Sequence, residues 1–106
     1  MIITTTPTLE GHTIVEYKGV VHGEAIFGIN FITDTFASLH DFFGGRSEGY
    51  EEELHRGQQA AMQEMEERAT KLGANAIVGM DLNFETVGPN GTMLMINACG
   101  TAVVMK

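Results

Sequence analysis

The most constraining feature of the sequence is its last apolar segment, TMLMINACGTAVVM, which runs from residue 92 to residue 105. Successive side chains of a strand point to opposite faces of a sheet, and here both sets are apolar. One set is Leu94, Ile96, Ala98 and Ala102, and the other is Met93, Met95, Cys99, Val103 and Met105. Apolar side chains on both faces are typical of a strand inside a sheet that is covered on both sides. The segment therefore predicts a central strand.

Two other segments alternate in the way that strands do. In residues 13–25, Val15, Tyr17 and Val21 are expected on one face, and Gly19 and Gly23 indicate close packing or a bulge. In residues 74–85, the side chains expected to face the core are Ala76, Val78, Met80, Leu82 and Phe84, whereas Asn75, Ile77, Gly79, Asp81, Asn83 and Glu85 are expected to face away. The sequence GPNG at 88–91 is typical of a type I turn, so the last two strands should form a hairpin.

Two segments have the apolar spacing of helices. The first covers residues 31–43 and carries four phenylalanines; the second runs from about Glu48 to Leu72, and Gly73 should end it. Its apolar stripe is expected to consist of Tyr50, Leu54, Ala61, Met62, Met65, Ala69 and Leu72. One layer of helices covers only one face of a sheet. A second copy of the chain is therefore expected to cover the other face, which predicts a homo-oligomer.

Composition limits the classes of protein to which the chain can belong. A length of 106 residues predicts a single domain, residues 1–106. The net charge of −8 should repel nucleic acid and anionic lipid. The chain lacks a long apolar run and a basic, apolar leader, so neither a membrane span nor a signal peptide is expected. The single cysteine, Cys99, suits a reducing cytoplasm.

Four stretches, found in order over nearly the whole chain, resemble the YbjQ-like family. They are TTTPTLEGHTIVEYKGVVHGE, NFITDTFASLHDFFGGRSEGYEEEL, LGANAIVGMDLNFE and GTMLMINACGTAV. The resemblance implies an α+β fold, namely a small two-layer domain with two helices packed on a mainly antiparallel sheet, similar to a dodecin subunit. It also implies assembly as a homopentameric ring. The family carries the description "putative heavy-metal-binding", and its function is uncharacterised.

Soft-metal binding has few candidate ligands in this chain. Cys99 shares a strand face with Met93 and Met95, which would make a thiolate and thioether set, and His22 is a further candidate. The sequence has no CxxC pair, and Cys and Met are common core residues. Packing against a helix or a second copy is therefore the favoured interpretation of these residues. A divalent or soft metal ion stays open as a cofactor.

The polar row Asp81, Asn83 and Glu85 is the second candidate site. A solvent-facing strand side is the simpler interpretation. In a symmetric ring, however, copies of this row would gather carboxylates around a cavity, where they would bind cations.

The sequence GGRSEGYEEEL, residues 44–54, is the third candidate. Gly44, Gly45, Arg46 and Ser47 before a helix have the ingredients of an anion cradle. The favoured interpretation is a corner between two helices, where Ser47 caps the second helix and Tyr50 opens its apolar stripe. Arg46 would then pair with a carboxylate of the next copy.

No catalytic triad, metal-hydrolase motif or acid–base pair stands out, so the chain is expected not to be an enzyme. Two functions are left open. One is a homo-oligomeric, pentameric protein that binds a metal ion or small ligand at sites shared between subunits. The other is a structural or interaction ring that presents an acidic helical surface to protein partners.

Overall fold

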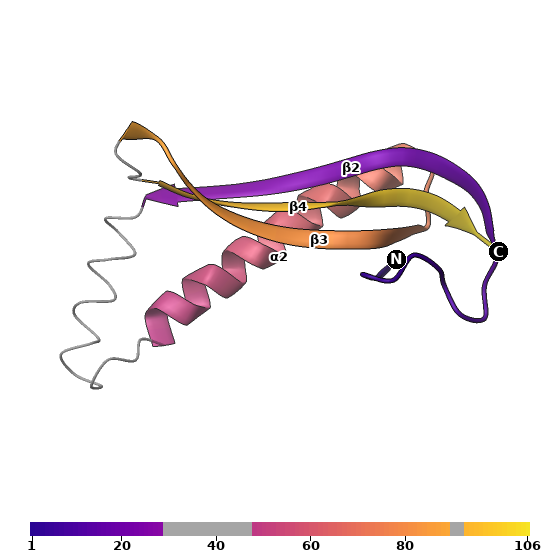
Figure 1. Ribbon diagram of the computed structural model, residues 1–106, viewed down its shortest axis with the longest axis horizontal. Coiled ribbons are helices and arrows are strands. Elements are labelled where there is room, and N and C mark those ends of the chain that lie inside the picture. The colour runs from indigo at the N-terminus through magenta and orange to yellow at the C-terminus, as the bar shows by residue number, and fades with distance from the viewer. Residues whose placement is uncertain (29–47, 90–92) are drawn as a thin grey trace.

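The computed structural model describes residues 1–28, 48–89 and 93–106. Its elements are β1 (Ile2–Ile3), β2 (Ile14–Gly28), α2 (Glu48–Lys71), β3 (Ala76–Val87) and β4 (Met93–Met105) (Figure 1). The strands form one four-stranded sheet in the order β1-β3-β4-β2. Strand β1 is parallel to β3, while the other pairs are antiparallel. This confirms a small, mainly antiparallel α+β domain with a helix on its sheet. The predicted helix at 31–43 lies outside the described residues.

Strand β4 occupies the centre of the sheet, as its two apolar faces predict. It pairs with β2 on one side and with β3 on the other. The buried residues Ile96, Ala98 and Ala102 belong to the cluster packed against α2, whereas Val103 belongs to a second cluster on the opposite face. The two sets of side chains therefore lie on the faces that the sequence indicates.

Helix α2 confirms the predicted second helix. It ends at Lys71, and Gly73 in the turn that follows has a positive φ of 87°. Ala61, Met65 and Ala69 of the predicted stripe are fully buried. Leu72 is 46% exposed, so its assignment to the buried stripe is wrong. The reason is its position: α2 ends at Lys71, and Leu72 lies in the turn that leaves the helix. The side chain of Tyr50 lies outside the described part of the chain.

Close packing between α2 and β2 depends on a glycine in the strand. A Cβ atom at Gly23 would overlap the carbonyl oxygen of Ala61 and lie 2.6 Å from the backbone nitrogen of Met65. The helix backbone therefore rests directly on the strand at this point. The sequence-based expectation of close packing at Gly23 is confirmed.

A bulge in β3 overturns part of the predicted alternation in that strand. The register with β4 shifts between Val78 and Asp81, and Gly79 has a positive φ of 62°. Before the bulge, Ile77 is fully buried in the α2 cluster, although strict alternation predicts that it faces away. Ala76 and Val78 lie instead on the opposite face, where they pack with Leu9. An extra residue in one strand shifts the alternation by one position. Side chains at odd positions therefore face one side of the sheet before the bulge and the other side after it.

Two bulges have the same effect in β2. Register shifts occur between Ile14 and Glu16 and between Tyr17 and Gly19. As a result Tyr17 pairs with Val103 on the face opposite α2, whereas Val21 is buried against α2. The prediction that Tyr17 and Val21 share a face is therefore wrong. Gly19, with a φ of 120°, marks the bulge that the sequence suggested as one alternative.

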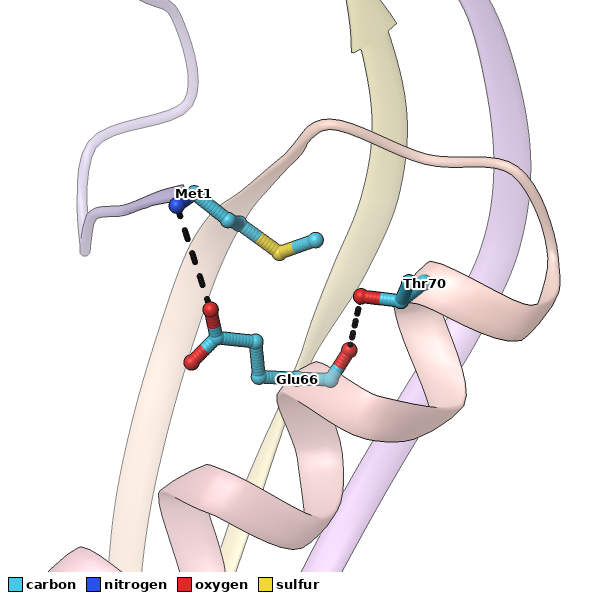
Figure 2. Close-up of polar contacts among 3 residues, drawn as sticks. All are labelled: Met1, Glu66 and Thr70. Carbon is cyan, nitrogen blue, oxygen red and sulfur yellow. Dashed lines mark hydrogen bonds and ion pairs between the residues drawn. The ribbon is translucent and has the colours of Figure 1, made fainter.

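The first residues of the chain are tied to the sheet and the helix. Thr4 N–H donates to the Ile77 carbonyl and Met80 N–H donates to the Thr4 carbonyl, at 2.9 and 3.0 Å. Figure 2 shows the α-amino group of Met1 3.8 Å from a carboxylate oxygen of Glu66, and the hydroxyl of Thr70 donating to the Glu66 carbonyl at 2.9 Å. These contacts place β1 beside β3 at one edge of the sheet.

Candidate functional site

The candidate site lies on the sheet face opposite α2, which we call the far face (Figure 1). At one end, Leu9 covers Ala76, Val78 and Val103. Beyond that end, the side chains of the far face come from three adjacent strands. They are Val20, His22, Glu24 and Ile26 of β2; Met93, Met95, Asn97, Cys99 and Thr101 of β4; and Asp81, Asn83, Glu85 and Val87 of β3.

The strand register arranges these side chains in rows across the sheet. Cys99 pairs with His22 on one side and with Asp81 on the other. The next row is Glu24, Asn97 and Asn83, and the one after it is Ile26, Met95 and Glu85. Directly paired residues of antiparallel strands have Cα atoms roughly 5 Å apart and point to the same face. Imidazole, thiol and carboxylate therefore lie side by side in the first row.

The structure thus joins candidates that the sequence presents separately. His22, the Cys99, Met93 and Met95 set, and the Asp81, Asn83 and Glu85 row all lie on the far face. Because β3 has a bulge and β4 is apolar on both faces, sequence alternation alone did not show that these sets share a face. Asn83 donates a hydrogen bond of 2.8 Å to a carboxylate oxygen of Asp81, which orients that carboxylate along the strand.

Asn97 is a site residue that sequence reasoning missed. It lies at the middle of the far face, between Glu24 and Asn83. Its side-chain oxygen is buried and accepts no hydrogen bond within the described residues. A buried oxygen without a donor costs free energy. The available signal was an amide in the middle of an otherwise apolar strand.

The donors of the far face fit a borderline divalent ion by type but not by number. Thiolate, imidazole and carboxylate are the ligands that Zn²⁺ takes in proteins. Over residues 1–28, 48–89 and 93–106, however, no group of three His, Cys, Asp or Glu side chains is close enough to hold a metal ion. Cys99 itself is half-buried. A metal site on this face would therefore need ligands beyond the described residues of one copy.

The third candidate, GGRSEGYEEEL at residues 44–54, lies only partly within the described residues. Helix α2 begins at Glu48, one residue after the predicted cap. Arg46 and Ser47 lie outside the described residues, so their assigned roles stay predictions. In the first turns of α2, Arg56 forms an ion pair of 3.0 Å with Glu53 on the exposed side of the helix.

A separate groove lies between the end of α2 and the edge of β2. It has a volume of about 440 Å³ and is lined by Val20, Val21, His22, Arg68, Lys71 and Leu72. Arg68 donates a hydrogen bond to the backbone carbonyl of His22 at 2.7 Å. Val20 and Leu72 are 70% and 46% exposed. The groove therefore combines exposed apolar surface with two cationic side chains.

Known proteins are similar to this chain over almost all of its length. The model of the YbjQ family, described as "putative heavy-metal-binding", matches residues 1–106. The chain belongs to this family. A UPF0145 protein of Clostridium botulinum is 58% identical over 103 residues, 97% of each chain. A UPF0145 protein of Listeria monocytogenes is 52% identical over 106 residues, which is all of this chain and 96% of the relative.

A solved structure is similar over the whole YbjQ-family chain. It is a protein of unknown function in the DUF74 family from Pediococcus pentosaceus, with a TM-score of 0.62 and 24% sequence identity, and the match covers 100% of this chain and 98% of that one. At this identity the likeness shows the fold alone. Among the described residues, no helix is both long enough and apolar enough to cross a membrane.

Proposed function

We propose that this YbjQ-family protein is a non-enzymatic homo-oligomer that binds a divalent metal ion at sites shared between copies on the far face. The observation that carries the proposal is the row formed by His22, Cys99 and Asp81 across three adjacent strands. A nitrogen, a sulfur and an oxygen donor side by side are a partial set for a borderline ion such as Zn²⁺. The family description points in the same direction.

Sharing between copies is supported by what the described residues of one copy lack. The described residues of a single copy do not gather three ligating side chains at one point. Symmetry places the same row on every copy, so a contact between far faces or between sheet edges multiplies the donors. Exposed apolar side chains on the far face, among them Ile26 at 53% and Val20 at 70%, support burial against another copy. The single cysteine agrees with a cytoplasmic location.

The second candidate is an interaction protein that presents an acidic helix to partners. Its support is the outer side of α2, where Glu51, Glu52 and Glu67 are exposed. This function needs no metal, so metal content separates the two candidates.

The deciding experiment is elemental analysis of protein purified without affinity tag or chelator, followed by calorimetric titration with Zn²⁺. The proposal expects a fixed ratio of metal to subunit. Cys99→Ser and His22→Gln should each weaken binding by about tenfold or more, because loss of a ligand costs at least as much as loss of an outer-shell partner.

His12→Gln is the matched control, because His12 is exposed and lies outside the row. It should bind Zn²⁺ as the wild type does. Protein that neither contains metal nor binds Zn²⁺ contradicts the proposal and favours the interaction protein.

A further inference from the structure

The groove between the end of α2 and the outer strand β2 has a chemistry that differs from that of the far face (Figure 1). We call it the edge groove, and it is lined by Val20, Val21, His22, Arg68, Lys71 and Leu72. Its volume of about 440 Å³ lies within the range of small-molecule sites, roughly 300–1,000 Å³. The edge groove is therefore large enough for a small organic ligand.

The apolar part of the edge groove stays in contact with water in the described structure. Val20 is 70% exposed and Leu72 is 46% exposed, whereas Val21 is buried under α2. Covering exposed apolar surface removes it from water and is favourable. A ligand that gains from this surface must itself carry an apolar part.

The two cations of the edge groove differ in what they already bind. Arg68 is paired with Glu64 at 2.9 Å and donates to the carbonyl of His22 at 2.7 Å. No ion pair or hydrogen bond of the Lys71 ammonium occurs within residues 1–28, 48–89 and 93–106. The described part of the groove thus holds one unpaired positive charge in a chain of net charge −8.

The end of α2 gives Lys71 little to bind. A lysine in a last helical turn commonly interacts with the free carbonyls there. In this protein the carbonyls of Arg68, Ala69 and Thr70 already accept hydrogen bonds from the N–H groups of residues 72–74, at 2.9–3.3 Å. These bonds close the helix end through the backbone, so the ammonium group is available to a ligand.

We propose that the edge groove binds a small organic monocarboxylate with an apolar body. The carboxylate would face the Lys71 ammonium, and the apolar body would cover Val20 and Leu72. A single negative charge fits best, because a further one would meet the Glu64 carboxylate beside Arg68. This site lies apart from the row of metal ligands on the far face and does not depend on metal binding or on assembly.

The test is a titration followed by amide chemical shifts in heteronuclear NMR spectra. The probes are hexanoate, hexylammonium and hexanol, which share one apolar chain and differ in the charge of the head group. Hexanoate should shift the amide signals of the residues that line the edge groove, with a lower dissociation constant than hexanol. Hexylammonium should bind more weakly than both, because its charge has the same sign as that of Lys71.

Two variants separate the charged part of the edge groove from its apolar part. Lys71→Gln should raise the dissociation constant of hexanoate about threefold and leave that of hexanol unchanged, because it removes a solvent-exposed ion pair. Leu72→Ser should weaken hexanoate and hexanol by the same factor, about threefold, because it removes apolar contact area. Both side chains are exposed, so the melting temperatures should stay close to wild type.

Lys106→Gln is the matched control, since Lys106 is exposed and lies outside the edge groove. It should bind hexanoate as the wild type does. Hexanoate that shifts no amide of the groove, or that shifts only amides elsewhere, overturns the proposal. Equal binding of hexanoate and hexylammonium, or a Lys71→Gln variant that binds hexanoate as the wild type does, overturns it as well.

Discussion

Arg68 in the last turns of α2 donates a hydrogen bond from Nη1 to the backbone carbonyl oxygen of His22 in β2, at 2.7 Å. The two residues are 46 positions apart in the chain. The contact joins the helix to β2, the outer strand of the sheet. Its second nitrogen, Nη2, pairs with Glu64 one turn earlier at 2.9 Å, which holds the guanidinium in place.

Replacement of Arg68 by alanine should lower the free energy of unfolding by about 1 kcal/mol. The change removes a charge-assisted hydrogen bond and a helical ion pair, but the side chain is half exposed, which limits the effect. Urea denaturation measures it. Arg56→Ala is the control, because it removes only an exposed ion pair with Glu53 and should cost less than about 0.5 kcal/mol. Equal losses in the two variants would contradict a role for the His22 carbonyl.

Gly23→Ala should destabilise the fold by about 2–3 kcal/mol. A methyl group at this position overlaps the backbone of α2 at Ala61, and a backbone cannot move aside as a side chain can. The melting temperature and the urea midpoint should both fall. A variant as stable as the wild type would show that α2 does not rest on β2 at this point.

Gly57→Ala is a contrasting substitution on the other side of the same interface. Its Cβ would lie 2.5 Å from Cδ1 of Ile96 and 2.8 Å from a ring carbon of Phe27, which are side-chain atoms and not backbone. Alanine also favours a helix by about 1 kcal/mol relative to glycine. These effects oppose each other, so the free energy of unfolding should change by less than about 1 kcal/mol.

Asn75→Ala should cost about 1–2 kcal/mol through the loss of two hydrogen bonds. The Asn75 side chain donates to the Met105 carbonyl at 3.0 Å and accepts from the Met105 N–H at 2.7 Å. Together these bonds hold the end of β4 beside the start of β3. Asn75→Asp retains the acceptor and should lose about half as much. Hydrogen exchange at the Met105 amide should accelerate in the alanine variant more than in the aspartate variant.

Met65→Ala should destabilise the protein by about 3 kcal/mol, because the side chain is fully buried at the centre of the α2 cluster. Met62→Ala is the matched comparison on the same helix. Met62 is only partly buried, so its truncation should cost about 1 kcal/mol. Thermal unfolding measures both effects. A Met62→Ala variant that is less stable than Met65→Ala would contradict the described packing.

Regular periodicity made several elements predictable from the sequence. The apolar stripe of α2, with Ala61, Met65 and Ala69, and the stop at Gly73 follow from local spacing and from the freedom of glycine at positive φ. The two faces of β4 follow from strict alternation. Strand β1 escaped prediction because Ile2–Ile3 is too short to show a period. Its position depends on backbone bonds to β3 that are distant in sequence.

The candidate site was predictable only as separate residues. The residue types of Cys99, His22 and Asp81 indicated metal chemistry, but their adjacency depends on two strand registers. The bulge between Val78 and Asp81 decides which side chains of β3 share a face with Cys99. Nothing local in the sequence sets that register, because it results from the packing of Ile77 under α2 and of Val78 under Leu9.

The order of amino acids was enough to predict the class of the domain, the long helix, the central strand and the list of possible ligands. These depend on periodicity and residue chemistry, which act over a few neighbouring positions. The shared row of His22, Cys99 and Asp81 and the position of the bulge in β3 come instead from the tertiary fold. Those features depend on which strands become neighbours and in which register, and burial of apolar side chains over the whole sheet selects that arrangement.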